Sequence, residues 1–144
     1  MSKLWTTEET QPFATPWREA VVLRVTDGDT VKLRVDLGFD VEVKAITRLL
    51  SENAVLTADK ADDGVDAWET RGNERVLGKI AKARVEALIP FASVVHIWSF
   101  KGKGAKGKWG RWLAVILYRC PKENGWRCLG ETLVAEGHAT RETY

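Results

Sequence analysis

The chain has few of the residues that stabilise small proteins covalently or through metals. It contains two cysteines and two histidines among 144 residues. Cys120 and Cys128 lack the spacing of a structural zinc site and are too few for a disulfide framework. We interpret them as a hairpin pair of packed thiols or a local disulfide. A chain of this length can fold around one hydrophobic core without such supports.

Long apolar runs and an excess of one charge are also missing. No stretch approaches the roughly 20 apolar residues of a membrane-spanning helix, and residues 1–17 lack the apolar centre of a signal peptide. We therefore expect no membrane partner, and either a cytoplasmic protein or the mature form of a secreted one. The formal net charge is only +2, so nucleic acid would have to bind to a local basic patch.

The chain does contain a succession of strand patterns. Residues 1–20 show no periodicity, and we interpret them as an N-terminal arm that precedes a domain at residues 21–144. Three strand patterns follow, the first two separated by an Asp-Gly turn, at residues 21–25, 31–35 and 41–46. Residues 51–63 are acidic and rich in small side chains, which predicts a loop or a short helical excursion.

Helical spacing appears after residue 75. Val76, Ile80, Ala83 and Ala87 fall on one face, and we expect that face to pack against the domain until Pro90 ends the helix. Two more strands and a short helix follow, with a glycine at the helix C-terminus, at residues 94–100, 111–118 and 131–136. This order predicts an α+β, mainly β fold, namely a five-stranded OB-fold barrel with two to three packed helices. Nothing fixes the oligomeric state, and we expect a monomer.

Acidic residues and arginines recur at the predicted turns and strand ends, at Asp27, Asp29, Arg48, Asp66, Glu69 and Arg111. Carboxylates supply the hard oxygen ligands that Ca²⁺ and Mg²⁺ take, and arginine binds phosphate oxygens bidentately. Metal-assisted phosphodiester hydrolysis needs this combination, together with a carboxylate that takes a proton from water.

Each of these features also has an ordinary structural explanation. Asp-Gly sequences suit tight turns, and Asp66 and Glu69 suit the start of a helix, where acidic groups interact well with the helix dipole. Arg48 in an alternating strand is usually solvated, and the glycine- and lysine-rich residues 101–110 fit a soluble loop. The functional hypothesis therefore depends on the features in order rather than on any one of them.

Taken in order, these residues resemble the staphylococcal nuclease family. Residues 25–33 (VTDGDTVKL) match its first motif, and residues 108–114 (KWGRWLA) are similar to its Lys-Tyr-Gly-Arg-x-Leu-Ala motif. If residues 51–63 are an insertion, the joined string RLLGVDAWE looks like the family's Arg-Leu-Leu-x-Val-Asp-x-Pro-Glu element. Residues 129–139 look like its terminal helix.

The resemblance implies an OB-fold and Ca²⁺-dependent hydrolysis of DNA and RNA, with single-stranded or frayed substrates preferred. It implies that Asp29 and Asp66 are metal carboxylates and that Ala67 offers its backbone carbonyl. It implies that Glu69 is the general base.

The same resemblance implies that Arg48 and Arg111 bind the scissile phosphate. The basic stretch before Arg111 would grip the nucleic acid through charge and stacking, with contacts from Lys106, Lys108 and Trp109.

Two departures from the family pattern keep alternatives open. Trp68 replaces a proline, and the 51–63 insertion interrupts the second motif. Without a gap, Asn53 and Leu56 would take the second metal and base positions, which would give an inactive protein. We prefer the gapped alignment because residues 69–72 lead straight into the helix. The alternatives are a catalytically impaired nucleic-acid-binding module and a protein-interaction module on the same fold.

Overall fold

A computed structural model describes residues 2–56, 64–100 and 112–142. Its strands are β1 (Arg18–Asp27), β2 (Thr30–Asp36), β3 (Glu42–Leu49), β4 (Gly64–Ala67), β5 (Val94–Phe100), β6 (Trp112–Cys120), β7 (Gly125–Cys128) and β8 (Ala139–Glu142). Its helices are α1 (Asn53–Leu56), α2 (Arg75–Leu88) and α3 (Leu129–Ala135), with 3₁₀ turns η1 (Gly72–Glu74) and η2 (Pro121–Glu123). None of the described helices is long and apolar enough to span a membrane.

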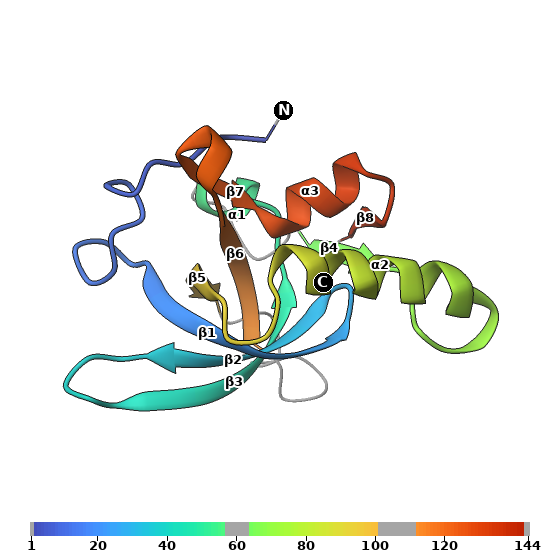
Figure 1. The fold of residues 1–144 in the computed structure, drawn as a ribbon, viewed down its shortest axis with the longest axis horizontal. Helices are drawn as coiled ribbons and strands as arrows, with labels where there is room; N and C mark the ends of the chain where they lie inside the picture. Colours follow the sequence, from blue (N-terminus) through green and yellow to red (C-terminus); the bar gives the residue numbers. More distant parts are fainter. Residues whose placement is uncertain (1, 57–63, 101–111, 143–144) are drawn as a thin grey trace.

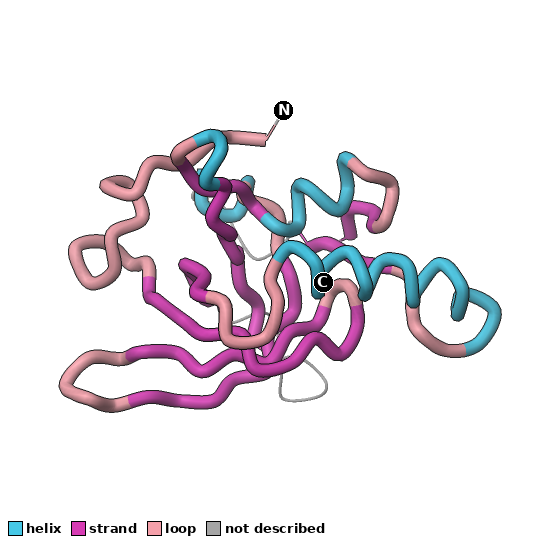
Figure 2. The backbone as a smooth tube through the Cα atoms, viewed as in Figure 1, coloured by secondary structure: helices cyan, strands magenta, loops and turns pink. Residues whose placement is uncertain are grey.

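Five strands close into a barrel (Figures 1 and 2). β2 pairs antiparallel with β1 and with β3, and β5 pairs antiparallel with β1 and with β6. β3 and β6 run parallel and complete the closure. β7 extends β6 as a hairpin, whereas β4 and β8 form a separate two-stranded sheet. This architecture confirms the predicted mainly β barrel with helices packed on it.

The apolar run of β6 lies between two hydrophobic clusters. Ala114 and Ile116 face the barrel core, while alternate side chains face a second cluster outside the barrel. The N-terminal arm covers that outer cluster with Trp5 and Trp17, which are both buried. A strand buried on both faces shows a continuous apolar sequence rather than alternation, which explains the pattern of β6.

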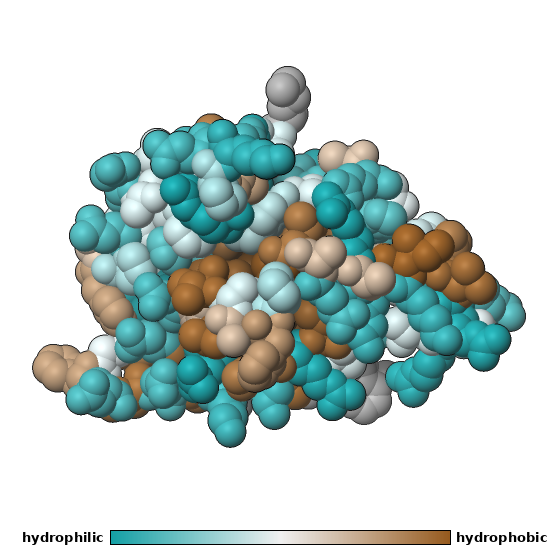
Figure 3. Space-filling view, in the orientation of Figure 1, coloured by the Kyte–Doolittle hydropathy of each residue, from teal (hydrophilic) through white to brown (hydrophobic). Residues whose placement is uncertain are grey.

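α2 packs with a different face from the one predicted. Its buried residues are Gly78, Ala81 and Val85. Val76 is 70% exposed and Ile80 is 49% exposed, and apolar surface shows over this part of α2 at the right of Figure 3. The prediction for this helix face was therefore wrong, and the reason lies in the packing of Gly78, described below.

Other local expectations had mixed outcomes. α3 ends as predicted at Gly137 (φ +80°), where His138 N–H donates to Leu133 C=O at 2.9 Å, the hydrogen bond of a Schellman motif.

The two cysteines are free thiols. Cys120 lies opposite Gly125 and Cys128 lies opposite Leu117, so the hairpin register separates them and the expected pair does not form.

Candidate functional site

The register of β2 and β3 brings the first acid and the first arginine together. Thr30 pairs with Arg48 across these strands. Leu49 N–H donates to the carbonyl of Asp29 at 3.0 Å. Asp29 therefore lies beside Arg48 because the β1–β2 turn and the end of β3 are neighbours in the sheet.

The second acid returns to this place after the chain leaves β3. Leu50 and Gly64 form an antiparallel bridge, so the two ends of the excursion lie next to each other. β4 then follows, and its Ala67 N–H donates to Asp29 Oδ2 at 3.0 Å. This bond docks the strand that carries Asp66 onto the turn that carries Asp29. The geometry corresponds to the gapped alignment, since Asn53 and Leu56 lie instead in α1.

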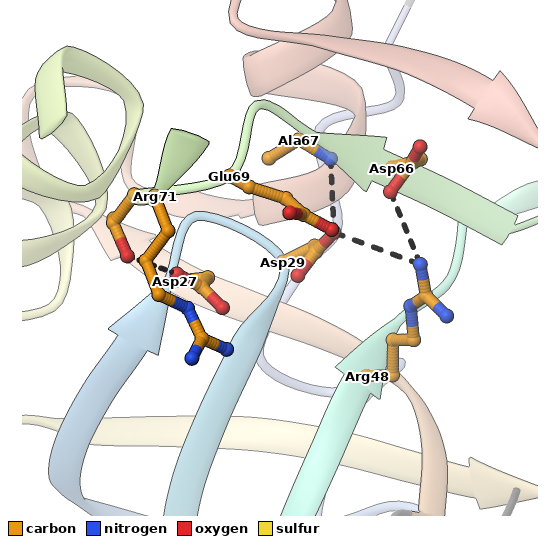
Figure 4. Close-up of a pocket in the computed structure, with 8 residues that line it drawn as sticks. Asp27, Asp29, Arg48, Asp66, Ala67, Glu69 and Arg71 are labelled. Carbon is orange, nitrogen blue, oxygen red and sulfur yellow. Dashed lines mark hydrogen bonds and ion pairs between the residues drawn. The ribbon is translucent and has the colours of Figure 1, made fainter. Parts of the chain in front are cut away.

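Both carboxylates face one nitrogen of Arg48 (Figure 4). Arg48 Nη2 lies 3.1 Å from Asp66 Oδ1 and 3.8 Å from Asp29 Oδ2. Asp29 is buried, and its Oδ1 accepts a hydrogen bond from Thr30 Oγ1 at 2.9 Å. Two acids from different strands thus converge on a single positive group.

The surroundings of Asp29 disfavour its negative charge. Burial raises the pKa of Asp29 to about 6, and the neighbouring Asp66 carboxyl acts in the same direction. The Ala67 N–H and the Arg48 guanidinium oppose this shift but do not cancel it. An additional cation at this place would therefore stabilise the ionised carboxylate.

Helix α2 and the β1–β2 turn hold the loop that carries Glu69. A Cβ on Gly78 would overlap the backbone carbonyl of Glu69, so the helix and the loop touch without room for a side chain. On the other side, Thr70 Oγ1 donates to Asp27 Oδ1 at 2.8 Å. The Glu69 side chain is exposed and lies over the same pocket as the two aspartates (Figure 4).

These residues line one cavity of about 460 Å³. Five of the predicted site residues lie in its wall, namely Asp29, Arg48, Asp66, Ala67 and Glu69. Three wall residues had no predicted role, namely Asp27, Thr70 and Arg71. The sequence indicated these three residues only by their position, because each lies within two residues of an acidic residue predicted to belong to the site.

The remaining predicted contacts lie outside the described residues. They are Arg111, Lys106, Lys108 and Trp109, so their proposed roles stay predictions from the sequence. The described part of β6 starts at Trp112, which pairs with Thr47, the neighbour of Arg48. The start of β6 therefore lies beside the end of β3 that carries the site.

The donor set at this place suits a hard divalent cation such as Ca²⁺. Two carboxylates already share one positive partner, and the backbone of Ala67 borders the same cavity. Within the described part of the chain, no three His, Cys, Asp or Glu side chains gather closely enough to hold a metal ion. A cation bound by Asp29 and Asp66 would therefore also need backbone and water oxygens.

The chain matches no protein-family model, and no curated protein matches its sequence. The fold and the pocket therefore define the class of this protein. It is a five-stranded mixed β-barrel with packed helices, consistent with an OB-fold, and it has an acidic pocket containing arginine at one end.

Proposed function

We propose that the protein is a Ca²⁺-dependent nuclease of the staphylococcal nuclease type, which hydrolyses phosphodiester bonds of DNA and RNA. The observation that carries this proposal is the convergence of Asp29 and Asp66 on Arg48 Nη2, with Glu69 in the same cavity. These are the side chains that metal-assisted phosphoryl transfer requires. Single-stranded or frayed nucleic acid is the expected substrate, because an exposed strand can place one phosphate in the cavity.

Each side chain has a distinct part in the proposed reaction. Arg48 binds a non-bridging oxygen of the scissile phosphate and stabilises the charge that grows there. Glu69 takes a proton from the attacking water, the water oxygen forms the new bond to phosphorus, and the ester oxygen leaves and is protonated by solvent. A bound Ca²⁺, held by Asp29, Asp66 and the Ala67 carbonyl, would supply further positive charge to the phosphate. Arg111 is expected to act with Arg48.

One observation favours the alternative of a binding module without turnover. Arg48 lies in an ion pair with Asp66, so it must give up that contact before its Nη2 can serve a phosphate. If this pair does not open, Arg48 cannot serve the scissile phosphate, and nucleic acid would be bound without cleavage by Arg71 in the cavity wall and by Lys106, Lys108 and Trp109, as expected from the sequence. The two functions differ in whether product forms when Ca²⁺ is added.

The test is cleavage of labelled single-stranded DNA and RNA with Ca²⁺ and with a chelator. We expect cleavage only with Ca²⁺, and a loss of about 10²–10⁴-fold in kcat for Glu69→Gln, the usual range for a general base. Glu86→Gln is the matched control, because Glu86 is exposed on α2 away from the cavity. Cleavage that continues in the chelator would refute the metal role.

A second measurement follows metal binding without relying on activity. Titration calorimetry with Ca²⁺ should show binding to the wild type and at least tenfold weaker binding to Asp66→Asn, since one of two carboxylate ligands is lost. Binding of single-stranded DNA without any cleavage, in a protein that does bind Ca²⁺, would support the binding module instead.

A further inference from the structure

The hairpin between β2 and β3 ends in apolar side chains that face solvent. Phe39 is 102% exposed, and Leu37, Val41 and Val43 are each about half exposed (46%, 52% and 44%). The hairpin projects from the barrel in Figure 1, and apolar surface is visible at its tip at the left of Figure 3. Single exposed apolar residues are common, but a cluster of this kind marks an interaction surface.

The backbone at the tip is held in an unusual conformation. Gly38, Phe39 and Asp40 have φ values of +85°, +54° and +62°. Tight hairpin turns of this hand favour Asn-Gly or Asp-Gly, and a bulky aromatic residue is disfavoured there. Because the Phe39 side chain makes no buried contact in the monomer, the fold of one chain does not explain its presence. Backbone strain of this kind is typical of functional positions.

Next to this tip the barrel has an open mouth. Among the described residues, small inward-facing side chains such as Ala45 and Thr47 border a cavity of about 380 Å³. Ile97 and Trp112 form apolar walls, and Arg18 contributes a positive charge. An engineered cavity of about 150 Å³ lined by apolar residues already accepts benzene, so this mouth has room for a phenyl ring.

Leu37 and Val43 line the mouth and also flank the tip. An exposed ring and a cavity that fits a ring therefore lie side by side on one surface. A two-fold dimer requires this arrangement, because each copy must offer both halves of the contact on the same patch.

We propose that two copies of this chain pair through a two-fold axis, each inserting Phe39 into the barrel mouth of the other. The charges are complementary, because Asp40 next to the ring meets Arg18 at the mouth. Arg18 is already oriented, since it stacks on Phe13 at 4.8 Å and donates to the Trp17 carbonyl at 3.1 Å. This inference is independent of the proposed nuclease activity, and it differs from the monomer expected from the sequence.

A lipid surface fits the tip less well than a second copy does. Asp36 and Asp40 flank Leu37 and Phe39 in the sequence, and acidic groups are repelled by the anionic lipids that attract peripheral proteins. A membrane surface also does not fill the barrel mouth.

The test is sedimentation of the full chain at about 1–200 μM, the range in which small interfaces of this kind associate. We expect the mass to rise from monomer towards dimer with concentration, and Phe39→Ser to remain monomeric throughout. Phe91→Ser is the control, because Phe91 is also exposed (76%) but follows α2. Circular dichroism on each variant establishes that it is folded.

Exchanging the charges of Asp40 and Arg18 distinguishes this pairing from nonspecific association. Asp40→Arg alone and Arg18→Asp alone should each weaken association at least tenfold, and the double variant should recover it, because both charges are reversed together. A wild type that stays monomeric across the range, or a Phe39→Ser variant that still dimerises, overturns the proposal. Binding of monomer to phosphatidylserine vesicles that is lost in Phe39→Ser, without any dimer in solution, also overturns it.

Discussion

The two ends of the barrel use small residues for opposite purposes. At the end that carries the acidic cavity, Gly28 and Gly78 let backbone segments touch, since a Cβ on Gly28 would lie 2.9 Å from Ala67 Cβ. At the other end, Ala45 borders a barrel mouth that the described residues leave unfilled. Close backbone contacts therefore fix the position of the acidic end, whereas the described residues leave a cavity at the other end.

This difference shows how one small fold separates the precise placement of polar groups from the exposure of an interaction surface. Polar groups that must meet within hydrogen-bonding distance need rigid neighbours on every side. An interaction surface needs an accessible cavity and an exposed side chain to match. Stability should therefore be most sensitive to added volume at the acidic end and should gain from added volume at the open end.

The largest effect is expected from Gly78→Ala. Alanine is the better helix former by about 1 kcal/mol, yet its Cβ would overlap the Glu69 carbonyl. We expect the unfolding free energy to fall by about 1–3 kcal/mol, and cleavage to fall by about 100-fold as the Glu69 loop moves. Chemical denaturation and initial rates measure the two effects. Ala83→Gly, on the exposed side of the same helix, should cost about 1 kcal/mol and leave the rate unchanged.

A smaller effect is expected from Thr70→Val, which removes the hydrogen bond to Asp27. A hydrogen bond contributes about 1 kcal/mol, so the unfolding free energy should fall by about that amount, and kcat should fall about tenfold because the Glu69 loop loses an anchor. Thr132→Val removes hydrogen bonds to the Tyr118 hydroxyl and the Cys128 carbonyl, and Thr132 lies outside the cavity wall. Equal rate losses in the two variants would show that Thr70 does not position Glu69.

The sequence predicted the strands well, because alternation along β2 and the Asp-Gly turn are local signals. It also led to the proximity of Asp29 and Arg48, which follows from hairpin register. The face of α2 was mispredicted because this helix has two candidate stripes. The larger apolar residues suggested one stripe, but the close approach of Gly78 to the Glu69 loop selects the other.

Long-range pairings had no local signal. β8 pairs with β4 although the two strands lie far apart in the sequence. Glu52 binds the N-terminal arm by accepting hydrogen bonds from Lys3 N–H and Trp5 Nε1, each at 3.0 Å. The left-handed backbone at Phe39 also escaped prediction, because an aromatic residue gives no cue for that conformation. These features depend on tertiary packing and therefore appear only with the fold.

At the open end, Ala45→Val should stabilise the protein rather than destabilise it. The added methyl groups occupy part of the barrel mouth, and valine favours a strand. We expect a gain of about 0.5–1.5 kcal/mol with unchanged cleavage, and weaker self-association because less room remains for Phe39. Thermal denaturation and sedimentation measure these effects. A loss of stability would mean that the mouth is already packed to its limit.

The smallest effect concerns the barrel wall between the two ends, where His96 on β5 holds the N-terminal arm. Its Nδ1 lies 2.8 Å from Thr10 Oγ1, and its ring stacks on Trp126 with 3.9 Å between centroids. His96 also lines a surface cavity that Glu8 and Glu19 border. Burial nevertheless lowers the pKa of His96 below its usual value.

Because the folded protein disfavours the charged form of His96, its contribution to stability is present above about pH 6.5 and is lost as the pH falls below that value. We expect the Tm to fall by a few degrees between pH 7.5 and pH 5.5, with a change in tryptophan fluorescence as the arm loosens. His96→Asn should reduce this pH dependence. An equal slope in the His96 variant would assign the acid sensitivity to other groups and leave the arm independent of pH.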